Sequence, residues 1–386
     1  MQSQFAKKDE TIFLCIVTLF WFAQYVYIPY QTTYLSSIHV ATGLIGMIVG
    51  AYGISQMLLR LPTGICADLI KKHRYFIMIG ALSSGVASTF RLIFNNGFGF
   101  FMGNIISGLA SAMWISLMVF YTSHFDSKNQ QYATARIVMF NNFGMLLGFL
   151  TSTVLYPISG MRVLCLLSIV AGMIGFVLSF SIHDLEVTST RMSLSSIIKS
   201  SLSKRLIIFS LGALVQQGIQ LTTTMSFTNQ ILKDLGASDT LLGVSSIIYM
   251  LSAVVFAKFS SSKYCTKKSS KFWICIVFII LSLYCTGVVS IHNIYFIMLM
   301  QILPGMGTGI LFSYLTSEAV KDVDESVKST AMGFFQAIYA IGMTVFPMIV
   351  SQIANVKDMQ TGYYFLAMVS LIASVVICIF YTRNWD

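Results

Sequence analysis

Residues 271–290 read KFWICIVFIILSLYCTGVVS, a run of mostly apolar residues with one charge, at Lys271. A helix of about 20 apolar residues is long enough to cross the hydrocarbon core of a bilayer. Short polar loops separate this run from others of the same kind. The full set of twelve lies near 11–36, 43–68, 75–95, 98–123, 133–157, 160–182, 205–231, 240–260, 271–290, 292–318, 329–353 and 360–382. The pattern predicts an all-α membrane protein with twelve transmembrane helices.

The composition agrees with this interpretation. Hydrophobic residues make up 56% of the chain and charged residues 10%, whereas a soluble domain carries about a quarter charged residues. No polar segment is long enough to fold as a separate soluble domain. Because polar side chains inside a membrane are costly, the few that occur within the spans are the first candidates for function.

The net charge of +10 indicates topology rather than nucleic-acid binding. Most loop Lys and Arg residues fall on one side of the alternating topology, and only Arg162, Lys233 and Lys357 fall on the other. Positively charged loops stay in the cytoplasm, so we expect both termini there. The expected protein is a lipid-embedded monomer that crosses a cell membrane many times, of the bacterial inner or plasma membrane type. Its seven cysteines form no obvious extracellular pair, and we expect no disulfide.

The two halves of the chain repeat each other weakly. Asn104-x-x-x-Gly108 in the fourth span recurs 197 positions later as Gln301-x-x-x-Gly305 in the tenth. Thr134-Ala135 recurs 196 positions later as Thr330-Ala331. We expect a six-helix half over 1–182, a cytoplasmic linker over 183–204 and a second six-helix half over 205–386. Repeats of this kind are typical of secondary transporters, which hold the substrate near the membrane midplane between the halves.

The loop after the second span carries a resemblance to a known family. It reads Gly64-Ile-Cys-Ala-Asp68-Leu-Ile-Lys71-Lys72-His73-Arg74, and it resembles the signature Gly-x-x-x-Asp-Arg-x-Gly-Arg-Arg of the major facilitator superfamily. Gly64, Asp68 and Lys72 match, and Lys71 stands where the signature has Gly. The run from Tyr52 to Pro62, Gly160-Met-Arg162 and the segment from Met332 to Tyr339 are similar to members of that family. The resemblance implies a two-lobed helical transporter, and it leaves the substrate open.

Two departures argue against standard drug–proton antiport. Many proton-coupled exporters of the family have Arg in the fourth span, four residues before a Gly, where this chain has Asn104. Their glycine-rich motif in the fifth span, which ends in Gly-Pro, is reduced here to Gly144 and Gly148, with Pro157 far along.

The sequence shows no enzyme constellation, no metal-ligand spacing and no phosphate-binding loop, so we expect no catalytic residues, no metal and no cofactor. No carboxylate lies in the middle of a span. If a proton is the coupling ion, Asp68, Glu318 or the substrate itself must carry it. The alternatives are uniport and coupling to another ion.

Arg60 is the sharpest single candidate. It lies two helical turns before Asp68, and an unpaired Arg at membrane depth costs at least about 2.5 kcal/mol. It shares a helix face with Gln56 and Tyr52 because the three are spaced by four residues. We expect it to face the central cavity, within reach of Gln336 and Tyr339. A structural Arg that extends to the cytoplasmic surface is the alternative.

Several spans carry polar or aromatic side chains at helical spacing. As cavity lining they describe an amphipathic pocket with amide and hydroxyl groups, and for each residue interhelical hydrogen bonding is the alternative. The candidate substrate-binding residues are Gln24, Tyr27, Gln31, Gln56, Arg60, Asn104, Trp114, Gln217, Gln220, Gln301, Gln336 and Tyr339.

Gly64, Asp68 and Lys72 form the candidate conformational switch. If the family fold holds, Asp68 ends its helix near the start of the eleventh span. A carboxylate that faces a helix N-terminus gains about 0.3–1 kcal/mol. Such a contact would form only when the cytoplasmic side is closed, and it would bias the two access states.

The sequence therefore predicts a secondary transporter that works by alternating access on a small-molecule substrate. Export or exchange of a small amphipathic organic compound is the first hypothesis. Uptake of a neutral polar solute, such as a sugar or nucleoside, is the alternative within the class. From another class, a non-transporting membrane receptor or a lipid scramblase remains open.

Overall fold

The computed structural model describes residues 7–40, 42–184 and 203–385, and the secondary structure there is helical. Most of the expected linker, residues 185–202, lies outside the described residues. The helices of the first half are α1 (Lys7–Tyr25), α2 (Ile28–Ser37), α3 (Thr42–Ile70), α4 (His73–Phe94), α5 (Gly97–Ala112), α6 (Trp114–Ser123), η1 (Ser127–Asn129) and α7 (Gln130–Ser179).

The second half continues in the same style. Its helices are α9 (Lys204–Thr222), η2 (Thr223–Phe227), α10 (Thr228–Asp234), α11 (Asp239–Ser260), η3 (Cys265–Lys267), α12 (Ser270–Ser290), α13 (Ile294–Met300), α14 (Ile302–Met306), η4 (Gly307–Leu311), α15 (Phe312–Ala319), η5 (Glu325–Val327), α16 (Lys328–Val356) and α17 (Met359–Trp385). Side-chain oxygens start several of them. Asn96 accepts a hydrogen bond from the backbone N–H of Gly99, and Ser203, Ser269 and Asn293 cap α9, α12 and α13 in the same way.

Ten stretches of the described residues are long and apolar enough to cross a membrane. One of them, α7, contains two of the predicted spans. Its residue Gly160 has φ 68° and ψ −173°, a conformation that is essentially restricted to glycine. The chain therefore turns there, between the predicted fifth and sixth spans. With α3 as the second span, the described helices confirm the predicted set of twelve.

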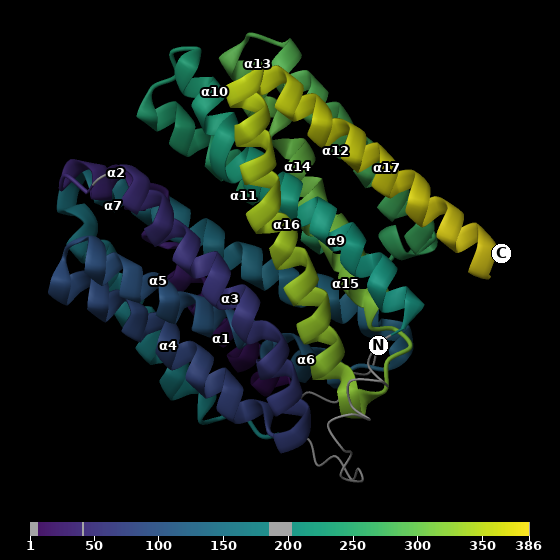
Figure 1. Cartoon of the computed structure of the whole chain (residues 1–386). Helices are drawn as coiled ribbons and strands as arrows, with labels where there is room; N and C mark the ends of the chain where they lie inside the picture. Colours follow the sequence, from purple (N-terminus) through teal and green to yellow (C-terminus); the bar gives the residue numbers. More distant parts are fainter. Residues whose placement is uncertain (1–6, 41, 185–202, 386) are drawn as a thin grey trace. The chain divides into compact units, whose positions relative to one another are not determined.

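The helices pack as two compact units (Figure 1). Unit 1 contains residues 1–129, 140–202 and 322–337, and unit 2 contains residues 130–139, 203–321 and 338–386. The first ten residues of α16 thus pack in unit 1, although they come from the second half of the sequence. The first ten residues of α7 pack in unit 2. Within unit 2, α12 and α17 lie side by side in Figure 1.

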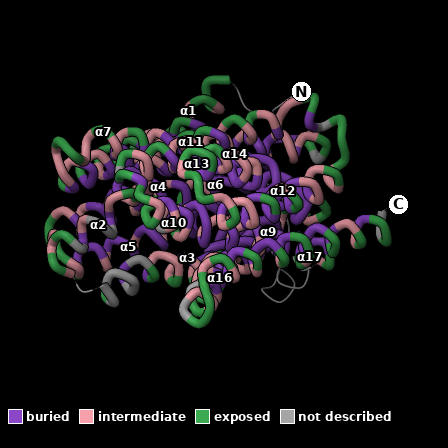
Figure 2. The backbone as a smooth tube through the Cα atoms, turned by 90° about the horizontal axis from the view of Figure 1, so that it is seen from above, coloured by how far each residue is buried: buried purple, intermediate pink, exposed green. Residues whose placement is uncertain are grey.

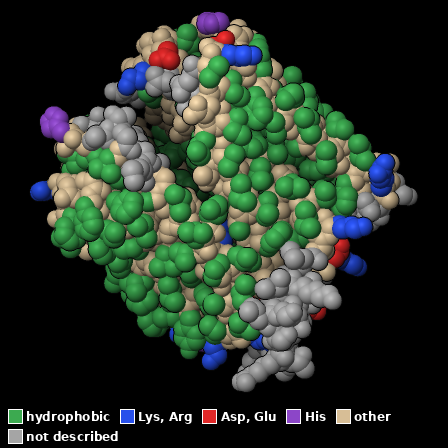
Figure 3. Space-filling model, viewed as in Figure 1, with side chains coloured by type: hydrophobic (Ala, Val, Ile, Leu, Met, Phe, Trp, Pro, Cys, Tyr) green, Lys and Arg blue, Asp and Glu red, His purple; other side chains and the backbone are tan. Residues whose placement is uncertain are grey.

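The faces of α17 show which surface meets lipid. Its buried side chains recur at helical spacing, as at Tyr363, Leu366, Ser370 and Ile377, and Figure 2 shows buried and exposed residues alternating along this helix. Its exposed side chains include Met368, Leu371, Ile372, Val375, Val376 and Ile379. A helix that is apolar all round belongs in a membrane. Apolar side chains cover most of the visible face in Figure 3, and the charged side chains lie mainly at its margins.

We expect position 128 and position 199 to be cytoplasmic. In a cysteine-free background, a single Cys at either position should not react with a membrane-impermeant thiol reagent added outside intact cells. Lys357→Cys, in a loop assigned to the opposite side, is the matched control and should react, since Lys357 is exposed. Labelling at 128, which is also exposed, would show that the orientation is inverted. Position 199 lies outside the described residues.

Candidate functional site

A buried arginine organises the interior of unit 1. Arg91 of α4 is 1% exposed. Its Nη2 donates to Asn104 Oδ1 and to Ser107 Oγ, each at 2.8 Å, and its Nη1 donates to Ser88 Oγ at 3.0 Å. The guanidinium carbon lies 3.9 Å from the centre of the Tyr27 ring, within the range of a cation–π interaction. Four side chains, from α4, from α5 and from the break between α1 and α2, thus surround one cation.

The hydrogen bonds continue from this cation into α1 and α3. Gln24 donates to the backbone oxygen of Ser107 at 3.0 Å and to Ser111 Oγ at 3.1 Å. The Tyr27 hydroxyl lies 3.2 Å from Ser107 Oγ, and Tyr52 bonds Ser111 Oγ at 2.8 Å. Asn104 donates to the backbone oxygen of Ile48 at 2.7 Å. We call this set of bonded side chains, centred on Arg91, the Arg91 network. It brings together the predicted residues Gln24, Tyr27 and Asn104.

Arg91 itself was not among the predicted residues. It lies near the end of α4, where a long cation usually extends outward to water. Side chains on a helix lean toward its N-terminus, however, and this one reaches Ser107, the eleventh residue of α5. At 1.5 Å rise per residue, that position is about 15 Å from the start of α5, or about half of the hydrocarbon thickness. An amide and two serines at helical spacing on the neighbouring span were the signal available in the sequence.

The scaffold around Arg91 recurs in unit 2, 197 positions later. Ser55 donates to the backbone oxygen of Ile105 at 2.9 Å, and Ser252 donates to that of Ile302 at 2.8 Å. The Tyr249 hydroxyl lies 2.8 Å from Thr308 Oγ1, as that of Tyr52 does from Ser111. The sequence repeat is therefore also a repeat of hydrogen bonds.

The amides of the repeat occupy the same positions in both units. Gln301 donates to Ser245 Oγ at 3.2 Å, and the equivalent Asn104 donates to the backbone of Ile48. Gln301 also accepts from the Tyr284 hydroxyl at 3.3 Å, whereas Asn104 accepts from Arg91. The position 197 residues after Arg91 holds Val288, which is also buried. The two units thus share these hydrogen bonds and differ in the buried charge, which unit 1 has at Arg91 and unit 2 lacks at Val288.

Irregular backbone also recurs at equivalent places. The helix is interrupted at Val26–Tyr27 between α1 and α2, and the position 197 residues later falls in the π-helix η2. It is interrupted again at Met113 between α5 and α6, and the equivalent position falls in the π-helix η4. Both interruptions of unit 1 lie next to the Arg91 network. π-Helical turns and broken membrane helices are frequent at functional sites.

The remaining predicted residues are distributed over both units. Trp114 packs edge-to-face on Trp21, with ring centres 5.3 Å apart, and Gln31 and Gln56 are buried in unit 1. In unit 2, Gln220 accepts from Gln216 at 3.0 Å, and Tyr339 packs on Phe312 at 5.7 Å.

The glutamines of α9 differ from the expected stripe. Gln217 is partly exposed, and Gln216, which was not predicted, is the buried member of the pair. A shift of one residue on a helix rotates a side chain by about 100°, since a turn has 3.6 residues.

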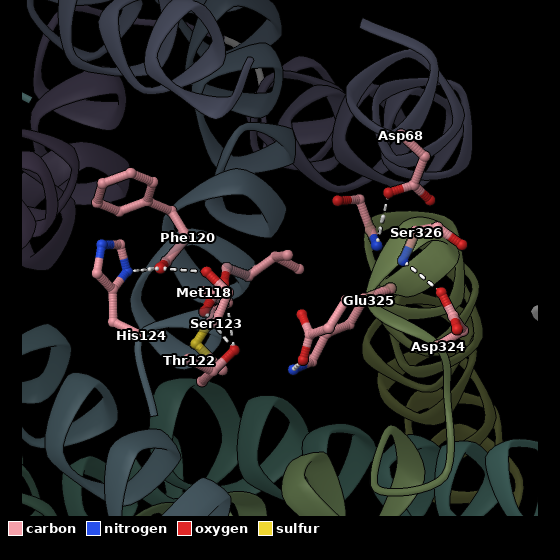
Figure 4. Close-up of polar contacts among 12 residues, drawn as sticks. Asp68, Met118, Phe120, Thr122, Ser123, His124, Asp324, Glu325 and Ser326 are labelled. Atoms are coloured by element: carbon pink, nitrogen blue, oxygen red, sulfur yellow. Dashed lines mark hydrogen bonds and ion pairs between the residues drawn. The ribbon is translucent and has the colours of Figure 1, made fainter. Parts of the chain in front are cut away.

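The start of α16 packs closely on α3 within unit 1. Asp68 accepts hydrogen bonds from the backbone N–H groups of Ser329, at 3.0 Å, and Thr330, at 2.6 Å. Figure 4 shows its carboxylate directed at the first residues of α16. A side chain at Gly64 would collide with the backbone oxygen of Ser329. The expected placement of Asp68 against the N-terminus of the eleventh span is thus present in the structure.

Arg60 makes a second contact between α3 and α16, two helical turns before Asp68. Its Nη1 donates to the backbone oxygen of Gln336 at 2.9 Å, and its side chain is 3% exposed. A Cβ added at Gly333 would lie 2.9 Å from the backbone oxygen of Arg60, so α3 and α16 are in backbone contact here. Arg60 therefore lies within reach of Gln336, as expected, in a buried position.

Lys72, the third residue of the candidate switch, lies beside Lys71 at the far end of the signature loop. Lys72 is exposed, with its ammonium 5.8 Å from the Tyr75 ring. Lys71 has φ 56°, in the left-handed region that favours glycine, and the family signature has Gly at this place. The fold thus keeps the backbone turn of the signature without its glycine.

Glu318, the second candidate proton carrier, is engaged in unit 2. One carboxylate oxygen pairs with the guanidinium of Arg205, and the other accepts from Ser270 Oγ at 2.7 Å. Arg205 Nε also donates to the backbone oxygen of Glu318 at 2.6 Å. The ion pair joins the start of α9 to the end of α15. In the described part of the chain, no three His, Cys, Asp or Glu side chains are grouped so that they could hold a metal ion.

Comparison with known proteins gives a consistent result. The model of the Major Facilitator Superfamily matches residues 13–215 and again residues 208–384. An uncharacterised MFS-type transporter of Methanocaldococcus jannaschii is 21% identical, over 96% of this chain and 98% of that protein.

Solved structures share the fold at low sequence identity. The Escherichia coli fucose:proton symporter FucP has a TM-score of 0.77 at 12% identity, covering 98% of this chain and 99% of that one. The human organic anion transporter MFSD10 has a TM-score of 0.76 at 12% identity, covering 95% and 98%. The chain is a multi-pass membrane transporter and not an enzyme, and it belongs to the major facilitator superfamily.

Proposed function

We propose that the protein exports or exchanges a small amphipathic organic compound by alternating access. The observation that carries this proposal is the Arg91 network, with the aromatic side chains beside it. Tyr27 covers the cation, and in the same unit Trp21 of α1 and Trp114 of α6 pack edge-to-face on one another. Small-molecule sites typically combine aromatic walls with a few placed polar groups.

Buried polar atoms without partners support a binding role. Among the described residues, Gln24 Oε1, Gln31 Oε1, Trp21 Nε1 and Asn141 Oδ1 have no hydrogen-bond partner. Each such atom costs about 1–3 kcal/mol when it stays unsatisfied. A bound solute with both donor and acceptor groups would reduce that cost.

Uptake of a neutral polar solute such as a sugar or nucleoside is the second candidate. The amide groups of Gln24, Asn104 and Gln301 suit it, because each offers both a donor and an acceptor.

The first experiment is a thermal-shift screen of the purified protein against drugs, sugars, nucleosides and organic acids. We expect amphipathic compounds to raise the melting temperature and sugars to leave it unchanged. Flux of the best ligand in intact cells and in everted vesicles then gives the direction. Stabilisation by sugars or nucleosides alone would favour the uptake permease. Ligand binding without any flux would contradict the proposed export or exchange of that compound.

Arg60 tests the contribution of α3 to binding. Arg60→Ala should weaken affinity for the best ligand about tenfold, which is about 1.4 kcal/mol, and change the melting temperature little. Arg60→Lys should also be impaired, because an ammonium lacks the planar fork of the guanidinium. Arg162→Ala removes an exposed cation and serves as the control. Unchanged affinity with a large fall in melting temperature would make Arg60 a structural residue.

A further inference from the structure

The two units share a set of hydrogen bonds but differ at Arg91. This difference distinguishes residues that build the fold from a residue with another role. Serine-to-backbone, tyrosine-to-hydroxyl and amide bonds occur at equivalent places in both units. What is common to both units is sufficient to build a six-helix half. Arg91 is present in unit 1 alone, since Val288 stands at its counterpart. The cation is therefore not required by the scaffold.

The charge of Arg91 has no ion-pair partner among the described residues of unit 1. Its hydrogen-bond partners Ser88, Asn104 and Ser107 are neutral. All fourteen Asp and Glu residues of the chain lie in loops or near the ends of spans, and in the described part of the chain none forms an ion pair with Arg91. A buried ion without a counter-charge is costly. Charged residues that persist inside a membrane protein are typically functional.

One nitrogen of the guanidinium makes no hydrogen bond to a described residue. Arg91 Nε is buried and has no hydrogen-bond partner among the described residues. A guanidinium presents five N–H groups, and a carboxylate is the acceptor that its planar fork fits best. The interruption of the first span at Val26–Tyr27 places Tyr27, which covers the cation, at a break in the helix. Tyr27 is thus positioned to move without unwinding a continuous helix.

We propose that Arg91 recognises an anionic group, a carboxylate, on the transported solute. The inference rests on the proposed function and narrows it to an amphipathic organic anion. The carboxylate supplies the missing negative charge and accepts from the guanidinium once Tyr27 swings aside. The apolar part of the solute packs against the neighbouring aromatic rings. Asn104 and Ser107 position the guanidinium. Together with Ser88 they accept three of its N–H hydrogen bonds when no solute is bound.

The test compares matched charged and uncharged compounds. The probes are phenylacetate, indole-3-acetate and hexanoate, each beside its primary amide, and affinity is measured on the purified protein by thermal shift and calorimetry. We expect wild-type protein to bind at least one carboxylate and to bind the matching amide much more weakly. Arg91→Gln should reduce the carboxylate affinity about ten- to hundredfold, as expected for loss of a charged hydrogen bond, and leave amide binding unchanged.

Arg162→Gln is the matched control, because it removes one exposed cation outside the network. Its carboxylate affinity should equal that of wild type. Arg91→Lys keeps the charge and should retain part of the preference for the carboxylate. The comparison of each carboxylate with its amide in wild-type protein needs no mutation. It therefore tests carboxylate recognition even if Arg91→Gln folds poorly.

Two results would overturn the inference. The first is a wild-type protein that binds amides as well as carboxylates, or binds no carboxylate at all. The second is an Arg91→Gln variant with undiminished carboxylate affinity. If neutral compounds from the broader screen bind and are transported, the proposed function stands and only the role of Arg91 falls. If carboxylates bind through Arg91 but are not transported, the transport proposal fails and the recognition site stands.

Discussion

Asp68→Asn should lower the transport rate at least tenfold while leaving the amount of folded protein in the membrane nearly unchanged. The carboxylate accepts from two backbone N–H groups at the start of α16. Hydrogen bonds to a charged group contribute about 1.5–3 kcal/mol, and the amide of Asn keeps only one acceptor oxygen. Because each 1.36 kcal/mol changes a rate tenfold, loss of this contact should strongly disturb the balance of access states.

Asp324→Asn is the control for this experiment. Asp324 accepts from the backbone N–H of Ser326 at 2.8 Å, in the turn just before α16 (Figure 4). Hydrogen bonds from the Ser326 side chain and from its backbone N–H hold the pKa of the Asp324 carboxyl below its usual value. The variant removes a charge from the same segment without touching α3, so it should transport normally. Transport by Asp68→Asn within about twofold of wild type, less than about 0.5 kcal/mol, would show that the contact is no switch.

Arg205→Ala should strongly destabilise the folded protein. It leaves the Glu318 carboxylate buried without its guanidinium, and breaking a buried ion pair costs about 3–5 kcal/mol. We expect a large fall in melting temperature in detergent. The paired change Arg205→Met with Glu318→Leu should recover most of it, because replacing both partners leaves no orphaned charge. If Arg205→Ala melts as wild type does, the pair contributes nothing to folding.

The same pair separates stability from proton coupling. Glu318 is held by Arg205 and Ser270, and its expected role is therefore structural. If a proton gradient drives transport, Asp68 is the remaining candidate among the two carboxylates. Neutralising both should uncouple transport, and intact proton-driven accumulation in that double variant would exclude both.

The spans, the repeat and the placement of Asp68 were predictable because they rest on periodic or local signals. Twenty-residue apolar runs report bilayer thickness, and a carboxylate at a helix end is attracted to a helix N-terminus. Asn104 and Gln301 were recognised as equivalent from an amide and a glycine one turn apart. Their hydrogen bonds confirm that they occupy equivalent positions in the two units.

Arg91 and Gln216 show where such reasoning stops. The position of Arg91 near a helix end predicts an outward-extending cation, and only its three-dimensional surroundings show that it points to the membrane interior. Gln216 and Gln217 are adjacent in an apolar span, and hydropathy does not distinguish which of them is buried. Both outcomes depend on helix rotation and neighbouring helices, which packing sets rather than composition.

Counterflow in proteoliposomes tests directly whether this chain is a secondary transporter. Purified protein is reconstituted into vesicles preloaded with the best ligand of the screen, and labelled ligand is added outside without ATP or an ion gradient. Alternating access predicts a saturable, transient accumulation of label above its equilibrium level. Each unlabelled molecule that leaves the vesicle brings the binding site back to the outside, where it binds label, and the excess of unlabelled compound inside competes with label for exit. Label that never exceeds its equilibrium level, with flux proportional to concentration, would show that the chain does not work by alternating access.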